Sequence, residues 1–340
     1  ALGDIAMTIP VLRSFFNTYP NQKITFVSRG FVEPLFKEFD NLEFVSVDFN
    51  NDYKGLKGLF KLFKLLRKKN IKAVADLHNV LRTKILKIFF KLVFIKVQSI
   101  DKGRADRKKL TQKNNKKFKP LTPIHYRYCD VFGRLGFPID LTNHEYPIKP
   151  FLPENSEEQK ILSKSEDKKI IGIAPFASFT GKNYPLDLMQ NVIAYLQKDH
   201  IIYLFGGGEN ELKQIKVWEN AYDNVTDIAS SFNLTEQINI ISYIDLMISM
   251  DSANGHIAAN YGVPVLTIWG MTHPFCGFTP FDQGIENSIM IDRNLYPQIP
   301  TSVFGNKIPK GYESAFRSVE PKEVIEKALE ILNLAKPRHN

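Results

Sequence analysis

The chain has 340 residues, of which 44% are hydrophobic, and two cysteines, Cys129 and Cys276. This length exceeds the size at which one core usually stops growing, so we expect two domains. Two cysteines provide neither a disulfide framework nor metal-ligand spacing, which suits a reducing cytoplasm. We find no signal peptide and no apolar run of about 18 residues, so we expect no membrane-spanning segment.

The net charge of +9 comes from one region of the chain. Residues 54–119 contain 22 Lys and Arg against 3 Asp and Glu, so the remainder has more acidic than basic residues. Only Phe118 accompanies the basic run at 101–119, whereas nucleic-acid sites interleave aromatic side chains for stacking, so we expect no nucleic-acid partner. Two interpretations stay open, a solvated face or contact with anionic lipid headgroups or a phosphorylated glycolipid acceptor.

The first residues, Ala1 to Thr8, read as a strand-to-helix turn at Gly3-Asp4 without its strand, so we expect the first strand of this domain to be missing. The chain then alternates short apolar runs with amphipathic ones, which predicts strands and helices in turn. We expect strands at 24–28, 42–47 and 73–77, helices at 56–69 and 125–135, and a loop at 101–119. Proline and charged residues at 147–167 indicate a domain boundary.

The second half opens with a buried strand at 169–175 and a polar loop that contains Ser178 and Lys182. A strand at 201–205 precedes Gly206-Gly207-Gly208-Glu209. Glycine-rich turns after strands often approach phosphate or ribose, but this turn lacks the Lys-Ser/Thr of a P-loop and the spacing of a dinucleotide fingerprint. By itself Lys182 is most simply a surface lysine.

Residues 244–280 carry the strongest functional signal. Apolar runs at 246–250 and 265–268 flank a short helix that Gly262 and Pro264 end, which predicts a parallel βαβ unit. Ligands of open parallel sheets lie beyond the carboxyl ends of the strands, where a helix N-terminus also favours phosphate. Each polar residue there has a simple structural role as a cap or packed side chain, but six lie together: Asp251, Ser252, Asn254, His256, Thr272 and His273.

Residues 251–259, followed by Gly262-Val263-Pro264 and by 270–274, resemble the nucleotide-sugar signature of glycosyltransferase family 9, the heptosyltransferases. Ala253 stands where the family more usually has Gly. Weaker resemblances lie at Gly3-Asp4, at residues 76–83 and at 182–185, where the family's Lys and Trp-Pro correspond to Lys182 and Tyr184-Pro185. Together they cover nearly the whole chain.

The resemblance implies an α/β fold of two Rossmann-like domains facing each other across a cleft, the GT-B arrangement. We expect an acceptor-binding N-terminal domain at 1–150, a linker at 151–168 and a nucleotide-sugar-binding domain at 169–318. We expect the helix within 319–340 to pack back on the N-terminal domain.

The resemblance also implies an inverting glycosyltransferase that moves a sugar, heptose from ADP-heptose, to a lipopolysaccharide core acceptor. Asp4 would be the general base, because an attacking hydroxyl must lose a proton; its other role is to complement a helix N-terminus. Lys182 would balance the donor diphosphate and Glu209 would bind the nucleoside. Ser178 and the six residues at 251–273 complete the expected donor site, and the acceptor site is expected at His78, Asn79 and Arg82.

No Asp-x-Asp triplet occurs, so we expect metal-independent transfer and no cofactor. We expect a cytoplasmic enzyme that is peripheral on the inner face of the membrane if the basic region binds lipid. Two alternatives remain, a nucleotide-sugar epimerase on a similar scaffold and a non-catalytic membrane-surface binding protein.

Overall fold

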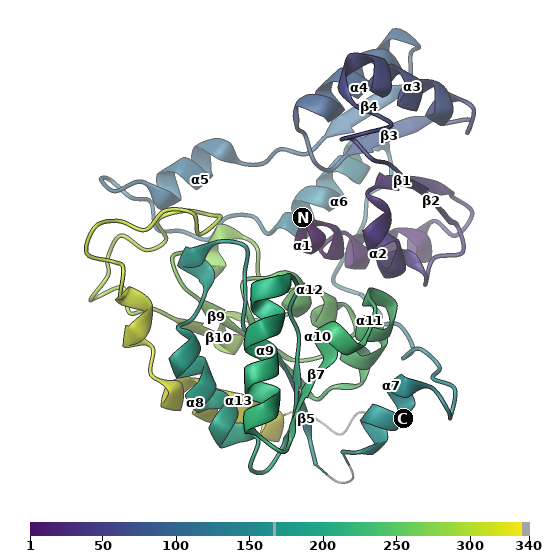
Figure 1. Cartoon of the computed structure of the whole chain (residues 1–340). Helices are drawn as coiled ribbons and strands as arrows, with labels where there is room; N and C mark the ends of the chain where they lie inside the picture. Colours follow the sequence, from purple (N-terminus) through teal and green to yellow (C-terminus); the bar gives the residue numbers. More distant parts are fainter. Residues whose placement is uncertain (166–167, 335–340) are drawn as a thin grey trace. The chain divides into compact units, whose positions relative to one another are not determined.

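Parallel strands alternate with helices in both halves of the chain, as the sequence predicts. The computed structural model describes residues 1–165 and 168–334. It forms two compact units (Figure 1), the first made of residues 1–104 and 122–145 and the second of residues 105–121 and the chain from Tyr146 onward.

The first unit contains two parallel strand pairs. Strand β1 (Ile24–Ser28) pairs with β2 (Leu42–Ser46), and β3 (Ala73–Asp76) pairs with β4 (Lys96–Ser99). The bounds of β1, β2 and β3 agree with the predicted strands to within one residue, whereas β4 was not predicted. Its helices are α1 (Leu2–Ala6), α2 (Ile9–Thr18), the 3₁₀ helix η1 (Gly30–Phe36), α3 (Gly55–Arg67), α4 (Leu81–Leu92) and α6 (Ile124–Leu135).

The second unit is built on a six-stranded parallel sheet with the strand order β10-β9-β8-β5-β6-β7. These strands are β5 (Ile170–Ala174), β6 (Ile201–Leu204), β7 (Val225–Asp227), β8 (Leu246–Met250), β9 (Val265–Trp269) and β10 (Ser288–Met290). Every residue of β5, β8 and β9 is buried. Strands covered on both faces read as continuous apolar runs, which is why they are visible in the sequence.

The second unit also contains most of the helices. They are α5 (Arg104–Thr111), α7 (Glu157–Ser163), α8 (Leu186–Leu196), α9 (Glu209–Ala221), α10 (Ile228–Ser231), α11 (Leu234–Tyr243), α12 (Ala253–Asn260) and α13 (Pro321–Leu334). Short 3₁₀ helices are η2 (Thr180–Lys182), η3 (Pro274–Cys276), η4 (Ile285–Asn287) and η5 (Ala315–Ser318).

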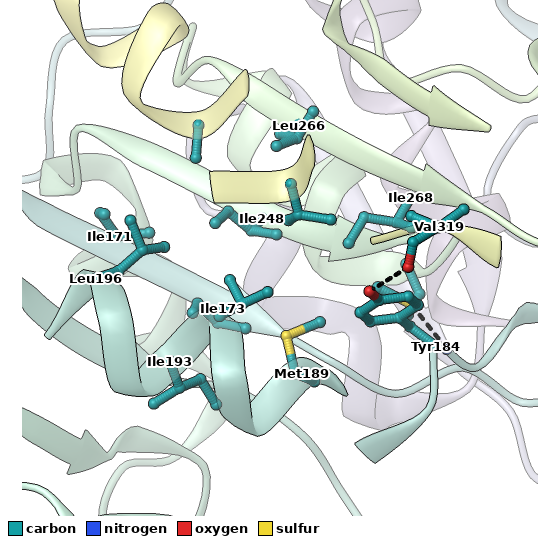
Figure 2. Packing of buried hydrophobic residues seen from close by; sticks show 14 of the residues in the cluster. Ile171, Ile173, Tyr184, Met189, Ile193, Leu196, Ile248, Leu266, Ile268 and Val319 are labelled. Carbon is teal, nitrogen blue, oxygen red and sulfur yellow. Dashed lines mark hydrogen bonds between the residues drawn. The ribbon is translucent and has the colours of Figure 1, made fainter. Parts of the chain in front are cut away.

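The core of the second unit lies between the central strands and helix α8 (Figure 2). Isoleucines of β5 and β8 pack against apolar residues of α8 such as Met189 and Ile193. At one end of this layer the hydroxyl of Tyr184 donates a hydrogen bond of 2.7 Å to the carbonyl of Val319. Burial raises the pKa of Tyr184 above its ordinary value, so this hydroxyl remains a donor.

Two expectations about the fold need correction, and the first concerns residues 101–119. Helix α5 occupies part of this predicted loop, and residues 105–121 belong to the second unit instead of the first domain. The reason is Leu110, which is fully buried in a cluster with Cys276 and Val303. One apolar residue among many charges gave too weak a pattern to predict this docking.

The second correction concerns the C-terminal helix. The apolar side of α13 packs on α8, β8 and β9 of the second unit, where Val324 and Ala328 are fully buried. The expectation that it packs on the first domain is therefore wrong for this face, which closes the second unit's own core. Residues 335–340 of the predicted helix and 166–167 of the predicted linker lie outside the described residues.

None of the helices in the described part of the chain is both long enough and apolar enough to cross a bilayer.

Replacing Tyr184 with Phe tests the tie between α8 and the segment that leads into α13. We expect the free energy of unfolding to fall by about 1–2 kcal/mol, because the buried carbonyl of Val319 loses its donor. Chemical denaturation measures this. Tyr195→Phe, on α8, is the control, because Tyr195 is 48% exposed and should tolerate the change. Equal stability of wild type and Tyr184→Phe would contradict the assignment.

Candidate functional site

The order of the strands locates the candidate site. From β5 the chain builds β6 and β7 on one side of the sheet, and later β8, β9 and β10 on the other. In open parallel sheets ligands bind beyond the carboxyl ends of the strands where the direction of building reverses. Here that point lies between β5 and β8, so the segments after these strands, 175–183 and 251–252, border it.

A buried ion pair joins these two segments. Nζ of Lys182 lies 2.7 Å from Oδ2 of Asp251 and donates to the backbone carbonyl of Asp251 at 3.2 Å. The side chains are 15% and 5% exposed, respectively. The loop before Lys182 is closed by the backbone N–H of Ala177, which donates to the side-chain oxygen of Asn183 at 2.6 Å. The structure thus fixes the ammonium group at the switch point of the sheet.

Two glycines bring the loop after β9 against the loop that carries Lys182. The N–H of Met271 donates to the carbonyl of Gly181 at 2.7 Å. A Cβ at Gly270 would come within 2.2 Å of that same carbonyl, and one at Gly181 within 2.4 Å of the carbonyl of Gly305. Residues with side chains do not fit at this approach, so the glycines allow Thr272 to lie beside the ion-paired loop.

Helix α12 starts at the same edge, with Ser252 as its N-cap residue. The hydroxyls of Ser252 and Thr272 are both buried and have no hydrogen-bond partner among the described residues. Buried polar groups are nearly always paired, so unpaired hydroxyls beside a fixed cation indicate groups that await a ligand. The helix N-terminus adds unpaired N–H groups and a partial positive charge. Asn254, in the first turn, is half-buried.

The other candidate on α12 is buried. His256 is 5% exposed and lies in the second turn of α12. The neighbouring Gly255 lets α12 pack closely on β8, since a Cβ there would lie 2.7 Å from Oγ of Ser249.

His273 is held as a neutral ring. Its Nδ1 accepts a hydrogen bond of 3.0 Å from the N–H of Phe275 and so caps η3. Burial above all, and then the charges of Arg293 and Lys116, lower the pKa of His273 to about 4. The proton of the neutral ring therefore resides on Nε2, which is a donor. Phe118 packs against the ring and also lies under Arg293, whose guanidinium is 3.4 Å from its centroid.

Sequence reasoning missed this last group. Lys116 and Phe118 lie in one segment, far along the chain from Arg293, and the two segments share no motif. Lys116 donates to the carbonyls of Leu110, Gln298 and Pro300, and burial first of all lowers its pKa to about 8.

A polar cavity of about 540 Å³ adjoins this segment, between α5 and residues 298–309. Lys113 and Lys307 are among its lining residues. Gly305, in the same loop, has a φ of +73°, and a Cβ there would meet Cγ of Lys182 at 2.5 Å. The loop therefore presses on the stem of Lys182 and restricts the positions of its ammonium group.

Two predicted donor residues are surface residues in this structure. Glu209 begins α9, is 82% exposed in its side chain and pairs with Lys213 one turn later at 2.6 Å. Ser178 is exposed in the loop after β5. The Lys182–Asp251 pair and the hydroxyls of Ser252 and Thr272 form the less exposed part of the candidate site.

Two candidates of the first unit are Asp4 and His78. Asp4 lies on α1 with a half-exposed side chain, and Tyr128 donates to its backbone carbonyl at 3.4 Å. Partial desolvation, and then the charge of Lys102, lower the pKa of His78, while the carboxylate of Asp4 opposes them. Asp4 and His78 are thus near enough to interact, as one site would require.

A buried aspartate shapes the acceptor-side turn after β3. Asp76 accepts hydrogen bonds from the backbone N–H groups of His78 at 3.1 Å and Asn79 at 2.7 Å. Asn79 adopts a positive φ of 45°, and its amide donates to the carbonyl of Ile100. Arg82 stacks its guanidinium 4.4 Å from the ring centroid of Phe49. All three predicted acceptor residues therefore lie on one ordered turn and the start of α4.

Among the described residues no group of three or more His, Cys, Asp and Glu side chains could hold a metal ion. The cationic side chain at the switch point is Lys182.

Replacing Lys182 with Met tests the buried pair. We expect the free energy of unfolding to fall by about 2–4 kcal/mol, because the carboxylate of Asp251 is left buried without its partner. The double variant Lys182→Met with Asp251→Asn should recover part of this loss, since neither charge remains. Thermal and chemical denaturation of the wild type, Lys182→Met, Asp251→Asn and the double variant gives the coupling energy between the two residues.

Lys169→Met is the matched control, because Lys169 pairs with Asp245 at 3.2 Å but is 53% exposed. Exposed pairs contribute about 0–1 kcal/mol, so this loss should be small. Additive losses in the double variant would contradict a direct Lys182–Asp251 interaction.

Comparison with known proteins agrees with this architecture. A model of glycosyltransferase family 9 (heptosyltransferase) matches residues 59–308. The lipopolysaccharide core heptosyltransferase OpsX of Haemophilus influenzae is 24% identical over 280 residues, which cover 81% of this chain and 78% of that protein.

Solved structures show the fold. A glycosyl transferase family 9 protein from Veillonella parvula superposes with a TM-score of 0.73 at 17% identity, over 98% of this chain and 95% of that one. The E. coli heptosyltransferase WaaC, solved with ADP, gives a TM-score of 0.66 at 16% identity over 97% of each chain.

The family and the fold class predicted from the sequence are thus confirmed. The chain has the α/β fold of the GT-B heptosyltransferases, and it belongs to glycosyltransferase family 9.

Proposed function

We propose that the protein transfers heptose from ADP-heptose to a lipopolysaccharide core acceptor, with inversion and without a metal ion. The observation that carries this proposal is the buried ammonium of Lys182, fixed beside two unpaired hydroxyls at the switch point of the second unit. This arrangement suits a diphosphate, and the relative from E. coli was solved with ADP.

On the donor side, Lys182 balances the charge that develops on the diphosphate as it leaves the sugar. The hydroxyls of Ser252 and Thr272 and the N-terminus of α12 donate to its oxygens. Asp251 is best understood as the residue that positions Lys182, because its own carboxylate would repel a phosphate. Neutral His273 offers the proton on Nε2 as a hydrogen-bond donor to the ligand. Asn254 and His256, both on α12, complete the proposed donor site.

The exposed candidates have a different proposed role. Glu209, at the start of α9, is suited to the hydroxyls of a ribose, although it must first release Lys213. Ser178 lies in the exposed polar loop after β5 and would add a hydrogen bond to the donor.

Chemistry at the acceptor is assigned to Asp4. The acceptor hydroxyl gives its proton to the carboxylate of Asp4 while its oxygen attacks C1 of the heptose. The bond between C1 and the ADP oxygen breaks, and its electron pair leaves with ADP. A single displacement of this kind inverts the configuration at C1. His78, Asn79 and Arg82 are proposed to hold the acceptor, with Arg82 suited to an acidic group.

Acceptors of this kind are anchored in a membrane, so we place the enzyme in the cytoplasm, against the inner face of the cytoplasmic membrane.

Replacing Asp4 with Asn tests the assignment of the base. We expect kcat to fall by about 10²–10⁴-fold, the usual contribution of a general base, with ADP binding unchanged. Release of ADP from ADP-heptose in the presence of a core acceptor measures turnover. Asp40→Asn, at an exposed aspartate of the same unit, should leave kcat unchanged.

Unaltered kcat in Asp4→Asn would remove Asp4 from the mechanism. Product analysis without acceptor addresses the alternatives, because an epimerase would release free or epimerised sugar under these conditions. A non-catalytic membrane-surface protein would give no product with or without acceptor.

A further inference from the structure

Helices α3 and α4 of the first unit pack side by side (Figure 1) and leave an outer surface exposed. Their inner sides meet in one apolar cluster, which buries Leu62, Phe63 and Phe90. Phe60 and Phe63 of α3 both contact the ring of Phe89 on α4, with centroids 5.6 Å apart in each case. The core of this region is therefore complete without the outer residues.

The outer surface nevertheless carries large apolar side chains. Along α4 and the turn after it, Leu81 is 74% exposed, Ile88 56%, Leu92 71% and Phe94 98%. On α3, Leu56 is 62% and Phe60 43% exposed. We call these six residues and the lysines among them the α3–α4 surface. Single exposed apolar residues are ordinary, but five on two adjacent helices, with a sixth just after α4, indicate an interaction site.

The lysines of this surface alternate with the apolar residues. Exposed Lys57, Lys61 and Lys64 follow one another along α3, and exposed Lys84 and Lys91 lie along α4. Residues 54–100 contain 13 Lys and Arg but a single acidic residue, Asp76, which is buried. The surface is therefore strongly positive, with no carboxylate of these helices to neutralise it.

Phe94 does not serve the fold. Its φ of +60° lies in the left-handed region, where it ends α4 by donating to the carbonyl of Lys91 at 3.0 Å. Glycine or asparagine is preferred at this position, because a Cβ is crowded by the following carbonyl oxygen there. A phenylalanine that is almost wholly exposed gains no packing to offset that crowding.

We propose that the α3–α4 surface docks the protein onto an anionic lipid bilayer. Apolar side chains, with Phe94 foremost, enter the boundary between headgroups and acyl chains, while the lysines contact the acidic headgroups. A protein partner fits less well, because lysine is depleted in protein interfaces. Aliphatic Leu81, Ile88 and Leu92 give a nucleic acid nothing on which to stack.

The position of α4 gives this docking a consequence, which rests on the function proposed above. Helix α4 begins at Leu81, shortly after His78 and Asn79, contains Arg82 in its first turn, and extends about 17 Å to Leu92. A bilayer in contact with α4 therefore lies next to the proposed acceptor residues. The saccharide of a membrane-anchored acceptor would reach them without the lipid leaving the membrane.

Vesicle co-sedimentation of the full chain tests the docking. We expect binding to vesicles of phosphatidylglycerol and phosphatidylcholine in equal parts, and little binding to phosphatidylcholine alone. Phe94→Gly should weaken binding by about ten-fold, in line with the loss of one large buried apolar group. The same variant should unfold at an equal or higher temperature, because glycine suits the left-handed backbone. Lost binding with retained stability separates a docking role from a structural one.

Charge reversal provides the second arm. Lys84→Glu with Lys91→Glu should weaken binding by at least about twenty-fold, since each basic residue near an anionic surface contributes about 1 kcal/mol, or five-fold. Matched controls on the second unit are Leu295→Ser, at a side chain that is 65% exposed, and Lys198→Glu, at an exposed lysine. Neither control should change vesicle binding.

Other outcomes would overturn the proposal. The first is that the protein does not bind anionic vesicles at low salt. The second is that the control variants lose as much vesicle binding as the α3–α4 variants. The third is that single-stranded nucleic acid displaces the vesicles while Phe94→Gly binds vesicles as well as the wild type does. ADP binding and transfer to a core oligosaccharide without its lipid should be unaffected by Phe94→Gly. If those assays succeed while vesicle binding fails, the docking proposal fails alone; if they fail while vesicles bind, the proposed function fails alone.

Discussion

The buried ion pair between Lys182 and Asp251 is the interaction on which the candidate site depends. Removing an ammonium and a carboxylate from water is costly, so both must be held in good geometry. The structure supplies that geometry by anchoring one partner after β5 and the other after β8, at the reversal of strand order. Gly181, Gly270 and Gly305 let the surrounding loops approach closely enough to hold the lysine. A cation fixed in this way needs no rearrangement to meet a diphosphate, which is the condition for electrostatic stabilisation of a leaving group.

The two units divide the proposed chemistry between them. The second unit holds the cation, the unpaired hydroxyls and the helix N-terminus, and these are groups suited to phosphate. The first unit holds the carboxylate of Asp4, the turn shaped by Asp76 and the basic, apolar surface of α3 and α4. Asp76 receives two backbone N–H groups, so the turn that carries His78 and Asn79 is rigid, as a site for a specific hydroxyl requires. The larger part of the basic region, residues 54–104, belongs to the first unit.

Runs of apolar residues in the sequence correctly predicted the buried strands of the second unit. Strands β5, β8 and β9 are apolar along their whole length because both faces are covered, and the βαβ unit around α12 follows from them. The docking of α5 was missed because it depends on Leu110 alone, and the packing of α13 because an amphipathic helix does not say which core it covers. The loop residues Lys182 and Thr272 could be proposed from motif resemblance. The surroundings of His273, which include Lys116 and Arg293, could not, because only tertiary contacts bring those segments together.

Calorimetric titration with nucleotides tests the central claim most directly, that the second unit holds a metal-independent diphosphate site around Lys182. The protein would be titrated with ADP, UDP, GDP and CMP in buffer containing EDTA. The account predicts that ADP binds under these conditions in preference to the other nucleotides, and that Lys182→Met combined with Asp251→Asn abolishes the binding while the protein remains folded. Binding that requires a divalent cation, or that survives in the folded double variant, would contradict it.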